Sequence, residues 1–561
     1  MKSSADLKLT PELGKIVNHD DLGMIICAPA GCGKTEALAL RTRQLLNCHD
    51  FANSGRRILI LTFTNNARDN IGDRLLHHLT TATIQDRVTL CNFHGLASRI
   101  ILNHGYNIGF DESWHIANTD WLESQLNKLG YNRHLKQVIK DMIHDAKLTN
   151  ITDDDVIRSL NHTMSDASSY AIKIERYRIQ NKIITYDDQV RIALWILNNK
   201  KVLSLYRNHF FAGIVDEFQD LTPQQLQLAT LICRNNITYA GDASQAIFSF
   251  AGANVSHTLE IIKSSGICEF ELTSSFRSSP SILRAINSLQ PLTQGTLLTC
   301  AFPEHWGEGG MFGSLHFNRI EEEARWIVAV TRAIHNHCPQ HRIGIISRSA
   351  FRMKGISQTL TDNKIPHYEW GDGRFSPTVA DILRYICQDP SLPKQTDLAM
   401  HIQNLTSKIT TDDPEELRLA SFWLCDQLSH SAPQDVINKI HSVTSSDTVS
   451  SAPGIHCLTG HAGKGQQFDW VFIPGLEEGC IPDYRAKTKD EISEEAKVLS
   501  VMLSRARIGA VVSYSLVNSN GYATRSSRFL SHLKRVEGIR TGSDDIISWF
   551  QNADWNALAS M

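Results

Sequence analysis

The sequence predicts an α/β fold made of two similar halves, each built around a mainly parallel sheet. Two sets of short runs rich in Ile, Leu and Val carry this prediction, because such runs between helix-like stretches are typical of buried parallel strands. The first set is 24–28, 57–64, 212–217 and 237–242, and the second is 342–349, 455–460, 470–475 and 509–515. Strands that alternate with helical patterns favour the α/β class.

The length of the chain supports more than one hydrophobic core. It has 561 residues, 42% of them hydrophobic, and single cores stop growing near roughly 250 to 300 residues. Mostly helical patterns interrupt each strand set and predict one inserted subdomain per half. The expected parts are a first domain (1–100 and 208–278), its helical insertion (101–207), a second domain (279–390 and 454–540), a reduced second insertion (391–453) and a C-terminal tail (541–561).

Composition excludes several classes of protein. The 56 basic and 59 acidic residues nearly cancel, so any site for nucleic acid must be a local basic groove. The chain starts with a polar segment, and no run approaches the roughly 18 apolar residues of a membrane span, so we expect a cytoplasmic protein without a membrane partner. Its twelve cysteines form no CxxC pair, which indicates neither a zinc ribbon nor a disulfide framework.

One short segment combines four residues that can bind metal, His335, His337, Cys338 and His341. Their spacing matches no common zinc pattern. We favour the alternative that they form the polar end of a helix before the next strand.

A phosphate-binding loop is predicted where the first strand meets a helix. In such loops glycines let backbone N–H groups wrap the phosphates, a lysine reaches the terminal phosphates and a hydroxyl holds Mg²⁺. Lys34 and Thr35 have the types and places for the last two roles, although Ala28 stands where the motif usually begins with glycine. The predicted loop comprises Ala28, Pro29, Ala30, Gly31, Cys32, Gly33, Lys34 and Thr35.

Two further strand ends complete the predicted nucleotide site. Asp216 and Glu217 follow an apolar strand, and paired carboxylates there suit a magnesium ligand and a base that activates water. Gln245 follows the strand YAGD and can place an amide near the terminal phosphate. Each motif alone has a structural alternative, but their combination indicates a site for a nucleoside triphosphate with Mg²⁺.

Eight motifs in order closely resemble the UvrD/Rep/PcrA branch of superfamily 1 DNA helicases, over about residues 10 to 530. They are APAGCGKT, LTFTNNA, CNFHGLA, VDEFQD, GDASQAIFSFAGA, LTSSFRSS, TGHAGKGQQFDWVFIPGLEEG and EEAKVLSVMLSRAR. The resemblance implies two RecA-like (P-loop NTPase) domains, each with an inserted subdomain, and ATP bound between them. It also implies that Asp216 holds the metal, Glu217 is the general base and Gln245 senses the γ-phosphate.

The resemblance also implies site residues outside the first domain. Arg277 and Arg505 would stabilise the charge on the transferring phosphoryl group. For single-stranded DNA it points to Phe63, Thr64, Asn65, Phe93, His94, Phe250 and His461. Aromatic side chains suit this role because each stacked base contributes roughly 1 to 3 kcal/mol with little sequence preference. Members of this branch move 3′ to 5′ on single-stranded DNA and unwind tailed duplexes, and we expect both here.

Four positions depart from the family pattern. The glutamine that reads adenine is replaced by Leu13, and the arginine after GKT by Glu36, so base recognition rests mainly on stacking by Phe276. Ala251 replaces an arginine that contacts nucleic acid, and Gln467 replaces a glutamate that touches the nucleotide sugar. We therefore predict a relaxed preference for ATP over other nucleoside triphosphates.

Two alternatives to a helicase in repair, recombination or antiviral defence stay open. The first is an ATPase that senses DNA ends and activates a partner nuclease without robust unwinding, since the second insertion is reduced. The second is a scaffold that binds DNA without hydrolysing ATP. A complete set of candidate catalytic residues argues against the scaffold: Lys34, Asp216, Glu217, Gln245, Arg277 and Arg505.

Overall fold

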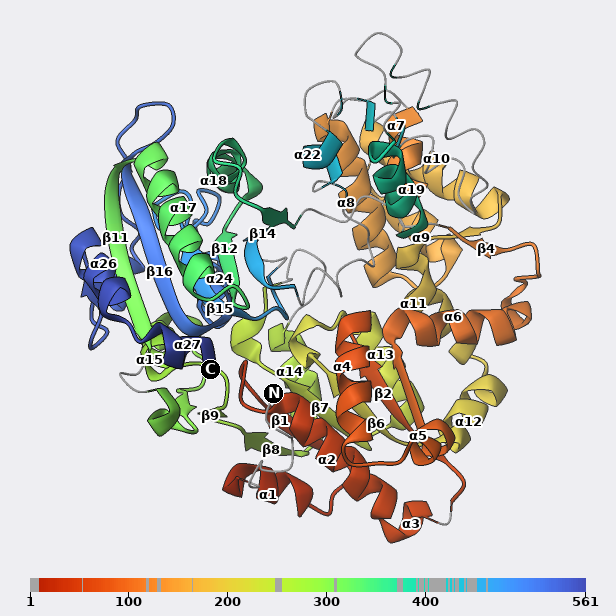
Figure 1. The fold of residues 1–561 in the computed structure, drawn as a ribbon. Helices are drawn as coiled ribbons and strands as arrows, with labels where there is room; N and C mark the ends of the chain where they lie inside the picture. The colour runs from red at the N-terminus through yellow and green to blue at the C-terminus, as the bar shows by residue number, and fades with distance from the viewer. Residues whose placement is uncertain are drawn as a thin grey trace. The chain divides into compact units, whose positions relative to one another are not determined.

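A computed structural model defines the protein in two compact units, Met1–Thr273 and Ser274–Met561, and each unit is described by itself (Figure 1). The described residues are 10–52, 54–117, 121–128, 133–163, 165–247, 255–306, 310–370, 377–389, 392, 398, 402, 420–421, 424–425, 428, 433–437, 440, 452–460 and 463–560.

The first unit contains a six-stranded parallel sheet in the order β3-β2-β6-β7-β1-β8. Its strands are β1 (Met24–Cys27), β2 (Arg57–Thr62), β3 (Val88–Asn92), β6 (Phe210–Asp216), β7 (Ile237–Gly241) and β8 (Cys268–Glu271). The four strands predicted for this half are confirmed as β1, β2, β6 and β7. Because all pairings are parallel, the carboxyl ends of the strands share one edge of the sheet.

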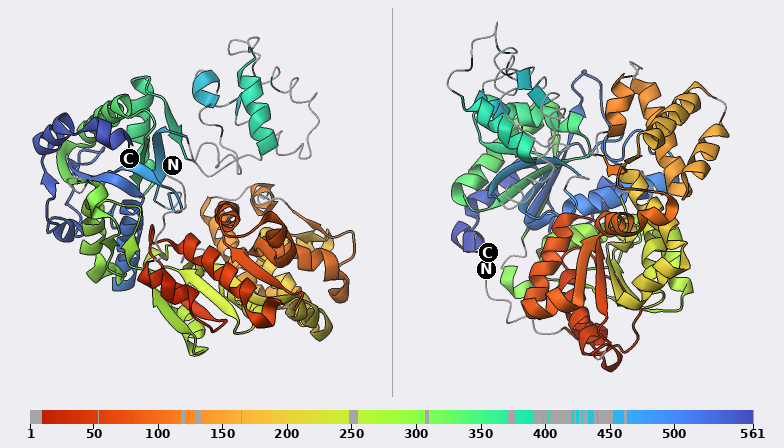
Figure 2. Two further views of the ribbon diagram at one scale, coloured as in Figure 1. Left: turned by 60° about the horizontal axis from the view of Figure 1, so that its bottom comes forward. Right: turned by 90° about the vertical axis from the view of Figure 1, so that its right-hand side faces the viewer.

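Helices cover both faces of this sheet (Figure 2). On one face α2 packs against α1 and α4, and on the other α11 packs against α6, α12 and α13. Alternate residues of β2, Leu59 and Leu61, enter the core of the second face, as the two-residue period of a strand requires. Outside the helical insertion, the helices of the first unit are α1 (Pro11–Val17), α2 (Lys34–Asn47), α3 (His49–Ala52), α4 (Asn65–Leu76), α5 (Thr81–Arg87), α6 (Phe93–His104), α11 (Tyr186–Leu197), α12 (Lys200–His209), α13 (Pro223–Cys233) and α14 (Val255–Ser264).

The helical insertion has a core of its own, built by α7 (Trp121–Lys128), α8 (Arg133–Thr149), α9 (Asp153–Asn161) and α10 (Asp166–Gln180). A short parallel pair, β4 (His115–Ile116) with β5 (Ile183–Ile184), joins the segments that enter and leave it. Helices α11 and α12 pack instead into the core of the sheet. The part with a separate core is therefore narrower than the range 101–207 marked out from the sequence.

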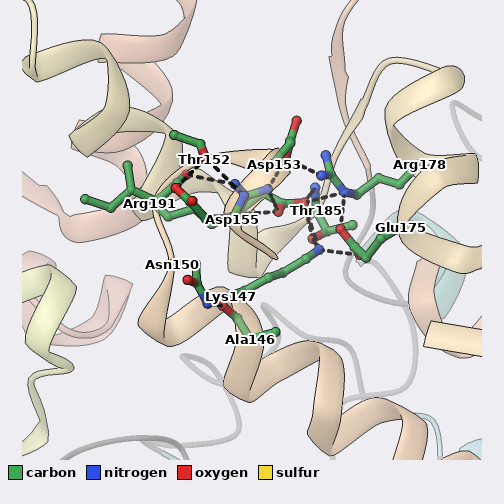
Figure 3. Close-up of polar contacts among 12 residues, drawn as sticks. Ala146, Lys147, Asn150, Thr152, Asp153, Asp155, Glu175, Arg178, Thr185 and Arg191 are labelled. Carbon is green, nitrogen blue, oxygen red and sulfur yellow. Dashed lines mark hydrogen bonds and ion pairs between the residues drawn. The ribbon is translucent and has the colours of Figure 1, made fainter. Parts of the chain in front are cut away.

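A buried network of charges links the insertion to α11 (Figure 3). Lys147 of α8 contacts Glu175 at 2.9 Å and Asp188 at 3.0 Å. The other members, all buried, are Asp153, Arg178 and Arg191, which complete a set of three cations and three carboxylates. Burial alone would raise the pKa of Asp188, but Arg178 and the other two cations hold it well below its ordinary value. The carboxyl group of Asp188 is therefore ionised near neutral pH.

The second unit contains a seven-stranded parallel sheet in the order β13-β14-β12-β15-β16-β11-β17. Its strands are β11 (Met311–Arg319), β12 (Arg342–Ser347), β13 (His367–Glu369), β14 (Gly454–Thr459), β15 (Phe468–Ile473), β16 (Ala506–Val517) and β17 (Arg540–Thr541), and a separate pair joins β9 (Ser274–Ser275) to β10 (Thr299–Cys300). The second set of predicted strands is confirmed as β12, β14, β15 and β16. Two mainly parallel α/β halves are thus observed, as predicted.

Helices complete the second unit and include the C-terminal segment. Trp470 of β15 is fully buried, and Trp549, Phe550 and Trp555 pack against it. Residues expected to form a tail are therefore helices that extend the core. The helices of this unit are α15 (Pro280–Ser288), α16 (Gln290–Thr293), α17 (Ile320–His337), α18 (Ala350–Asp362), α19 (Pro377–Cys387), α22 (Pro433–Ile437), α24 (Lys489–Leu503), α25 (Leu530–Leu533), α26 (Ser543–Asn552) and α27 (Trp555–Ser560).

The segment with three histidines and Cys338 is the end of a helix, as the favoured alternative has it. His335 and His337 lie in the last turn of α17, and β12 begins shortly afterwards. His337 stacks on Trp555, and Nδ1 of His341 accepts a hydrogen bond from Trp470. These contacts direct the imidazoles of His337 and His341 to different partners.

We predict that Lys147→Met destabilises the first unit by about 3 to 5 kcal/mol, because it removes one of the three cations that pair with the buried carboxylates. Lys140→Met is the matched control on the same helix, since Lys140 is 52% exposed and lies 3.8 Å from Glu123. The control should cost less than about 1 kcal/mol. Urea denaturation followed by circular dichroism measures both. Equal losses for the two variants would contradict a structural role for the network.

Candidate active site

The register of the first sheet brings three predicted motifs together. β7 lies between β1 and β6 and pairs with both, with Cys27 opposite Gly241 and Asp216 opposite Ala240. The loops that follow these strands therefore emerge side by side at the carboxyl edge. In open parallel sheets this edge is the usual place for ligands.

The phosphate loop has the backbone that a phosphate cradle requires. Gly31 and Gly33 adopt φ values of 84° and 85°, a left-handed region that disfavours side chains. The loop is fixed at its start by a hydrogen bond of 2.8 Å from the N–H of Ala28 to the carbonyl of Gly241. Lys34 and Thr35 open α2, so the positive end of the helix dipole faces the loop.

Lys34 holds the acidic pair. Its Nζ lies 2.8 Å from Oδ1 of Asp216 and 2.5 Å from Oε1 of Glu217. Burial alone would lower the pKa of Lys34, but the two carboxylates outweigh burial and raise it, so the side chain stays charged. The lysine thus lies between the loop and the carboxylates, where it can move to a phosphate when a nucleotide binds.

Asp216 fits the role of a ligand to a divalent cation. It is 5% exposed, and its buried Oδ1 makes no hydrogen bond beside the ion pair with Lys34. Burial raises the pKa of its carboxyl, against the attraction of Lys34. A divalent cation bound there would supply the further polar partner that Oδ1 of Asp216 lacks. Carboxylate oxygens are the ligand type that Mg²⁺ prefers.

Glu217 has an unusual backbone conformation that a neighbouring amide supports. Its φ of 57° and ψ of 51° place a non-glycine residue in the left-handed region, which costs on the order of 1 to 3 kcal/mol. Nε2 of Gln219 donates a 2.6 Å hydrogen bond to Oε2 of Glu217, and its Oε1 accepts from the N–H of Asp242 at 3.0 Å. Gln219 therefore orients the candidate base and ties it to the end of β7.

Gln219 was not predicted as a site residue, although the motif VDEFQD contains it. Its fixed position depends on Gly241, because a Cβ there would lie 2.2 Å from Oε1 of Gln219 and 2.7 Å from the ring of Phe218. A glutamine two residues after a strand-end carboxylate was the only sequence signal for this contact.

The predicted γ-phosphate sensor lies close to the same loops. Gln245 ends a 3₁₀ turn, Ala243–Gln245, that Asp242 caps. Its Nε2 donates a 2.6 Å hydrogen bond to Oδ2 of Asp242. The first sheet thus gathers the loop residues, Asp216, Glu217 and Gln245 at one edge.

The second unit brings three other predicted residues together. With its oxygen facing the guanidinium, the amide of Gln467 accepts two 2.6 Å hydrogen bonds from Arg277. Arg505 is 3% exposed, and its guanidinium donates to the carbonyls of Val501 at 3.0 Å and Gln466 at 3.4 Å. The sequence Gln466–Gln467 therefore touches both candidate arginines.

Phe276 lies in an aromatic group that the sequence did not predict. Its ring centroid is 5.8 Å from that of Phe302, which stacks on His305 at 5.1 Å. Phe302 is 38% exposed, so the group offers an aromatic surface suited to a nucleobase. Phe302 and His305 lie outside the motif LTSSFRSS, so no sequence pattern connected them with Phe276.

The segments directly after β2 and β3, which include the first turns of α4 and α6, carry five of the seven predicted DNA-binding residues. Thr64 and Asn65 are exposed at the start of α4, and Phe63 is half-buried. Oδ1 of Asn65 accepts a 2.9 Å hydrogen bond from Asn92, which also caps α6. Since β2 and β3 are neighbours, this contact joins the two candidate loops into one polar surface.

His94 and Phe93 have different surroundings. His94 stacks on Tyr186, with centroids 3.6 Å apart, and burial lowers the pKa of His94 to about 4, so its ring is neutral at pH 7. Tyr186 is 47% exposed and belongs to the same surface, although the sequence did not predict it. Phe93 is 1% exposed and packs in the core. The expectation that Phe93 stacks on a nucleobase is therefore corrected, because the sheet and its helices enclose the ring.

Phe250 and His461, together with Ala251, lie outside the described residues. Leu13 and Glu36, the two changed positions of the base-recognition pattern, are both described. Leu13 is 1% exposed, and Glu36 pairs with His78 at 2.8 Å and Arg74 at 3.4 Å. Neither side chain is free to read a base.

The fold and this edge define a P-loop nucleoside triphosphatase. Residues 9–265 match the family model of the UvrD/REP helicase N-terminal domain, and residues 426–516 match that of the UvrD-like helicase C-terminal domain. The chain belongs to the UvrD-like helicase family.

Several curated proteins are similar over most of the chain. DNA helicase II of Rickettsia typhi is 22% identical over 651 aligned positions, which cover 95% of this chain and 96% of that protein. ATP-dependent DNA helicase UvrD2 of Mycobacterium tuberculosis is 23% identical, covering 90% of this chain and 79% of that protein. ATP-dependent DNA helicase PcrA of Leuconostoc citreum is 24% identical, covering 65% of this chain and 50% of that protein.

The family assigns the chain to the ATP-dependent DNA helicases, with ATP as the nucleotide and DNA as the substrate. This confirms the predicted fold class and enzyme class. In the part of the chain that the structure describes, no helix combines the length and apolar character of a membrane span.

We predict that Glu217→Gln lowers kcat for ATP hydrolysis by about 10² to 10⁴-fold, the usual contribution of a general base, while ATP still binds. Glu260→Gln, an exposed carboxylate on α14, is the matched control and should leave kcat unchanged. Steady-state hydrolysis and a fluorescent-nucleotide titration measure the two quantities. Full activity in Glu217→Gln would exclude Glu217 as the base.

Proposed function

We propose that this protein couples hydrolysis of Mg²⁺-ATP to 3′ to 5′ movement along single-stranded DNA and to unwinding of tailed duplexes. The observation that carries the proposal is the shared edge of the first sheet. Loops with nucleotide chemistry follow β1, β6 and β7, and a polar and aromatic surface follows the adjoining β2 and β3. A nucleotide and a DNA strand bound there would touch loops of neighbouring strands.

Each residue at the nucleotide edge has a proposed role. Backbone N–H groups of the loop and Lys34 bind the phosphates, while Thr35 and Asp216 hold Mg²⁺, which neutralises charge on the phosphate oxygens when bound. Glu217, oriented by Gln219, accepts a proton from the attacking water. Gln245 responds to the γ-phosphate through its bond to Asp242.

Residues of the second unit are proposed to act on the same nucleotide, as the family resemblance implies. Arg277 and Arg505 would stabilise the negative charge of the transferring phosphoryl group. Gln467 is neutral, so its hydrogen bonds orient Arg277 without neutralising the guanidinium. Phe276, beside Phe302, would stack on the base.

The proposed coupling passes through β6, which pairs with β2 on one side and β7 on the other. Asp216 and Glu217 at its end contact Lys34, and the loop after β2 begins the DNA surface. A change in the contacts of Lys34 on hydrolysis can therefore reach the DNA loops through adjacent backbone. Repeated changes of grip would produce translocation.

A DNA-end sensor that activates a partner nuclease is the second candidate function. The match to DNA helicase II of Rickettsia typhi extends over 651 positions, more than the 561 residues of this chain. That relative therefore has segments that this chain lacks. The reduced second insertion expected from the sequence favours an ATPase whose strand separation depends on a partner.

We predict that single-stranded DNA stimulates ATP hydrolysis and that a duplex with a 3′ tail is unwound while one with a 5′ tail is not. The readouts are steady-state hydrolysis with and without DNA and strand separation of the two labelled duplexes. Glu217→Gln is the catalytic control for both. Preferential unwinding from the 5′ tail would contradict the polarity, and stimulation without unwinding would support the nuclease-activating alternative.

We predict that kcat/KM values for ATP, GTP and CTP lie within about tenfold of one another. A base-specific hydrogen bond contributes about 1 kcal/mol, and the buried Leu13 and the paired Glu36 do not supply it. Phe276→Leu should raise KM for all three nucleotides alike, because stacking is not base-specific. A strong preference for ATP would show that other residues read the base.

A further inference from the structure

A cluster of three different metal-binding side chains lies at the opposite, amino-terminal edge of the first sheet. His19 and Asp21 belong to the loop between α1 and β1, and Cys268 is the first residue of β8. Cys268 pairs in register with Met24, so strand pairing fixes it beside that loop. One ligand atom from each residue lies within 4.8 Å of the other two, and no other group of this kind occurs among the residues that the structure describes.

We propose that His19, Asp21 and Cys268 bind a Zn²⁺ ion, with water in the fourth position. Zinc bonds to nitrogen and oxygen are about 2.0 to 2.2 Å long, so two such ligands at a tetrahedral angle lie roughly 3.3 to 3.5 Å apart. Nε2 of His19 and Oδ2 of Asp21 are 3.3 Å apart. The pair is thus already spaced as two ligands of one tetrahedral ion.

The surroundings of the His19 ring indicate that a ligand is missing beside its Nε2. Its Nε2 is buried and makes no hydrogen bond, although it lies close to Asp21. The ring is held from the side by Phe270 of β8, with centroids 5.0 Å apart in an edge-on arrangement. A buried ring nitrogen normally has a partner, and a metal ion would provide one here.

The loop backbone is fixed before any metal arrives. Arg41 of α2 is fully buried and donates hydrogen bonds to the carbonyls of His19, at 2.8 Å, and Asp21. Gln44, one turn further along α2, donates to the same carbonyl of His19 at 2.6 Å. Two ligands on a fixed loop and one on a strand lose little freedom on binding, so the site is preorganised.

The donor set selects the type of metal. Thiolate and imidazole ligands suit Zn²⁺, whereas Mg²⁺ and Ca²⁺ prefer sites made only of oxygen. Cys268 is a free, exposed thiol and can be deprotonated by the metal. The carboxylate of Asp21 lies within the cluster and supplies negative charge that attracts a cation.

The ion would fasten the edge strand of the sheet. β8 pairs with β1 and, among the described strands, with no other, so one of its sides lacks backbone partners. Beyond β8 the chain continues to Thr273, whose N–H and hydroxyl bond to Glu12 of α1. Zinc would add a second tie at the start of β8. Since the site lies at the edge away from Lys34, zinc should stabilise the unit without changing the chemistry.

The test uses full-length protein without a histidine tag, freed of metal with a chelator and assayed without nucleotide. Zn²⁺ binding is measured by calorimetry, thermal unfolding with and without Zn²⁺ gives Tm, and Co²⁺ reports a thiolate ligand through its charge-transfer absorption. The variants are His19→Gln, Asp21→Asn and Cys268→Ser. Their matched controls are Asp20→Asn, the adjacent carboxylate, and Cys48→Ser, a cysteine outside the cluster.

The expected result is one Zn²⁺ per chain, a rise in Tm with zinc concentration, and at least about tenfold weaker binding in each variant. Both controls should bind as the natural chain does, and Cys268→Ser should abolish the Co²⁺ absorption. Basal ATP hydrolysis of the variants should be unchanged, which verifies that they fold. Undetectable binding, or binding that the three variants retain, would overturn the proposal.

Discussion

The position of Lys34 between Asp216 and Glu217 depends on the parallel register of three strands. Lys34 follows β1, the carboxylates end β6, and β7 separates the two strands while pairing with both. A shift of any strand by one residue would turn its side chains to the other face of the sheet. The register therefore decides whether a phosphate loop and a metal ligand share one site.

Close packing at the end of β7 enforces the geometry of the candidate base. Gly241 leaves room for Gln219 and Phe218, and Gln219 fixes the carboxylate of Glu217. The left-handed backbone of Glu217 is unfavourable by itself, so these contacts must stabilise it. Such local strain is typical of catalytic positions, where orientation matters more than backbone stability. The sheet supplies the rigidity that this arrangement requires.

Sequence patterns predicted the central strands well, for a physical reason. β1, β2, β6 and β7 are buried on both faces and therefore consist mainly of apolar residues. β8 and β3 were missed because polar residues interrupt them, as in the exposed edge strand CEFE. The fold class followed from the central strands, while the full extent of each sheet required tertiary structure.

Single residues were harder to predict than motifs. The phosphate loop and the acidic pair have fixed spacing, and the structure places their residues side by side. Phe93 was expected to contact DNA because the motif CNFHGLA resembles that of the family, yet it packs in the core. Lys147 shows the opposite case, since a lysine in a polar helix looks solvated but is buried in the charge network. Burial is decided by distant segments, which local sequence does not reveal.

We propose different roles for the two edges of the first sheet, catalysis at the carboxyl edge and stabilisation at the amino edge. At the carboxyl edge, the proposed binding of phosphate would change the contacts of Lys34 with Asp216 and Glu217. At the amino edge His19 and Asp21 sit on backbone that Arg41 holds, remote from the moving charges. A metal bound there would stabilise the edge strand β8 at a place away from the proposed nucleotide site. Stability can then be added at one edge while the strain at Glu217 persists at the other.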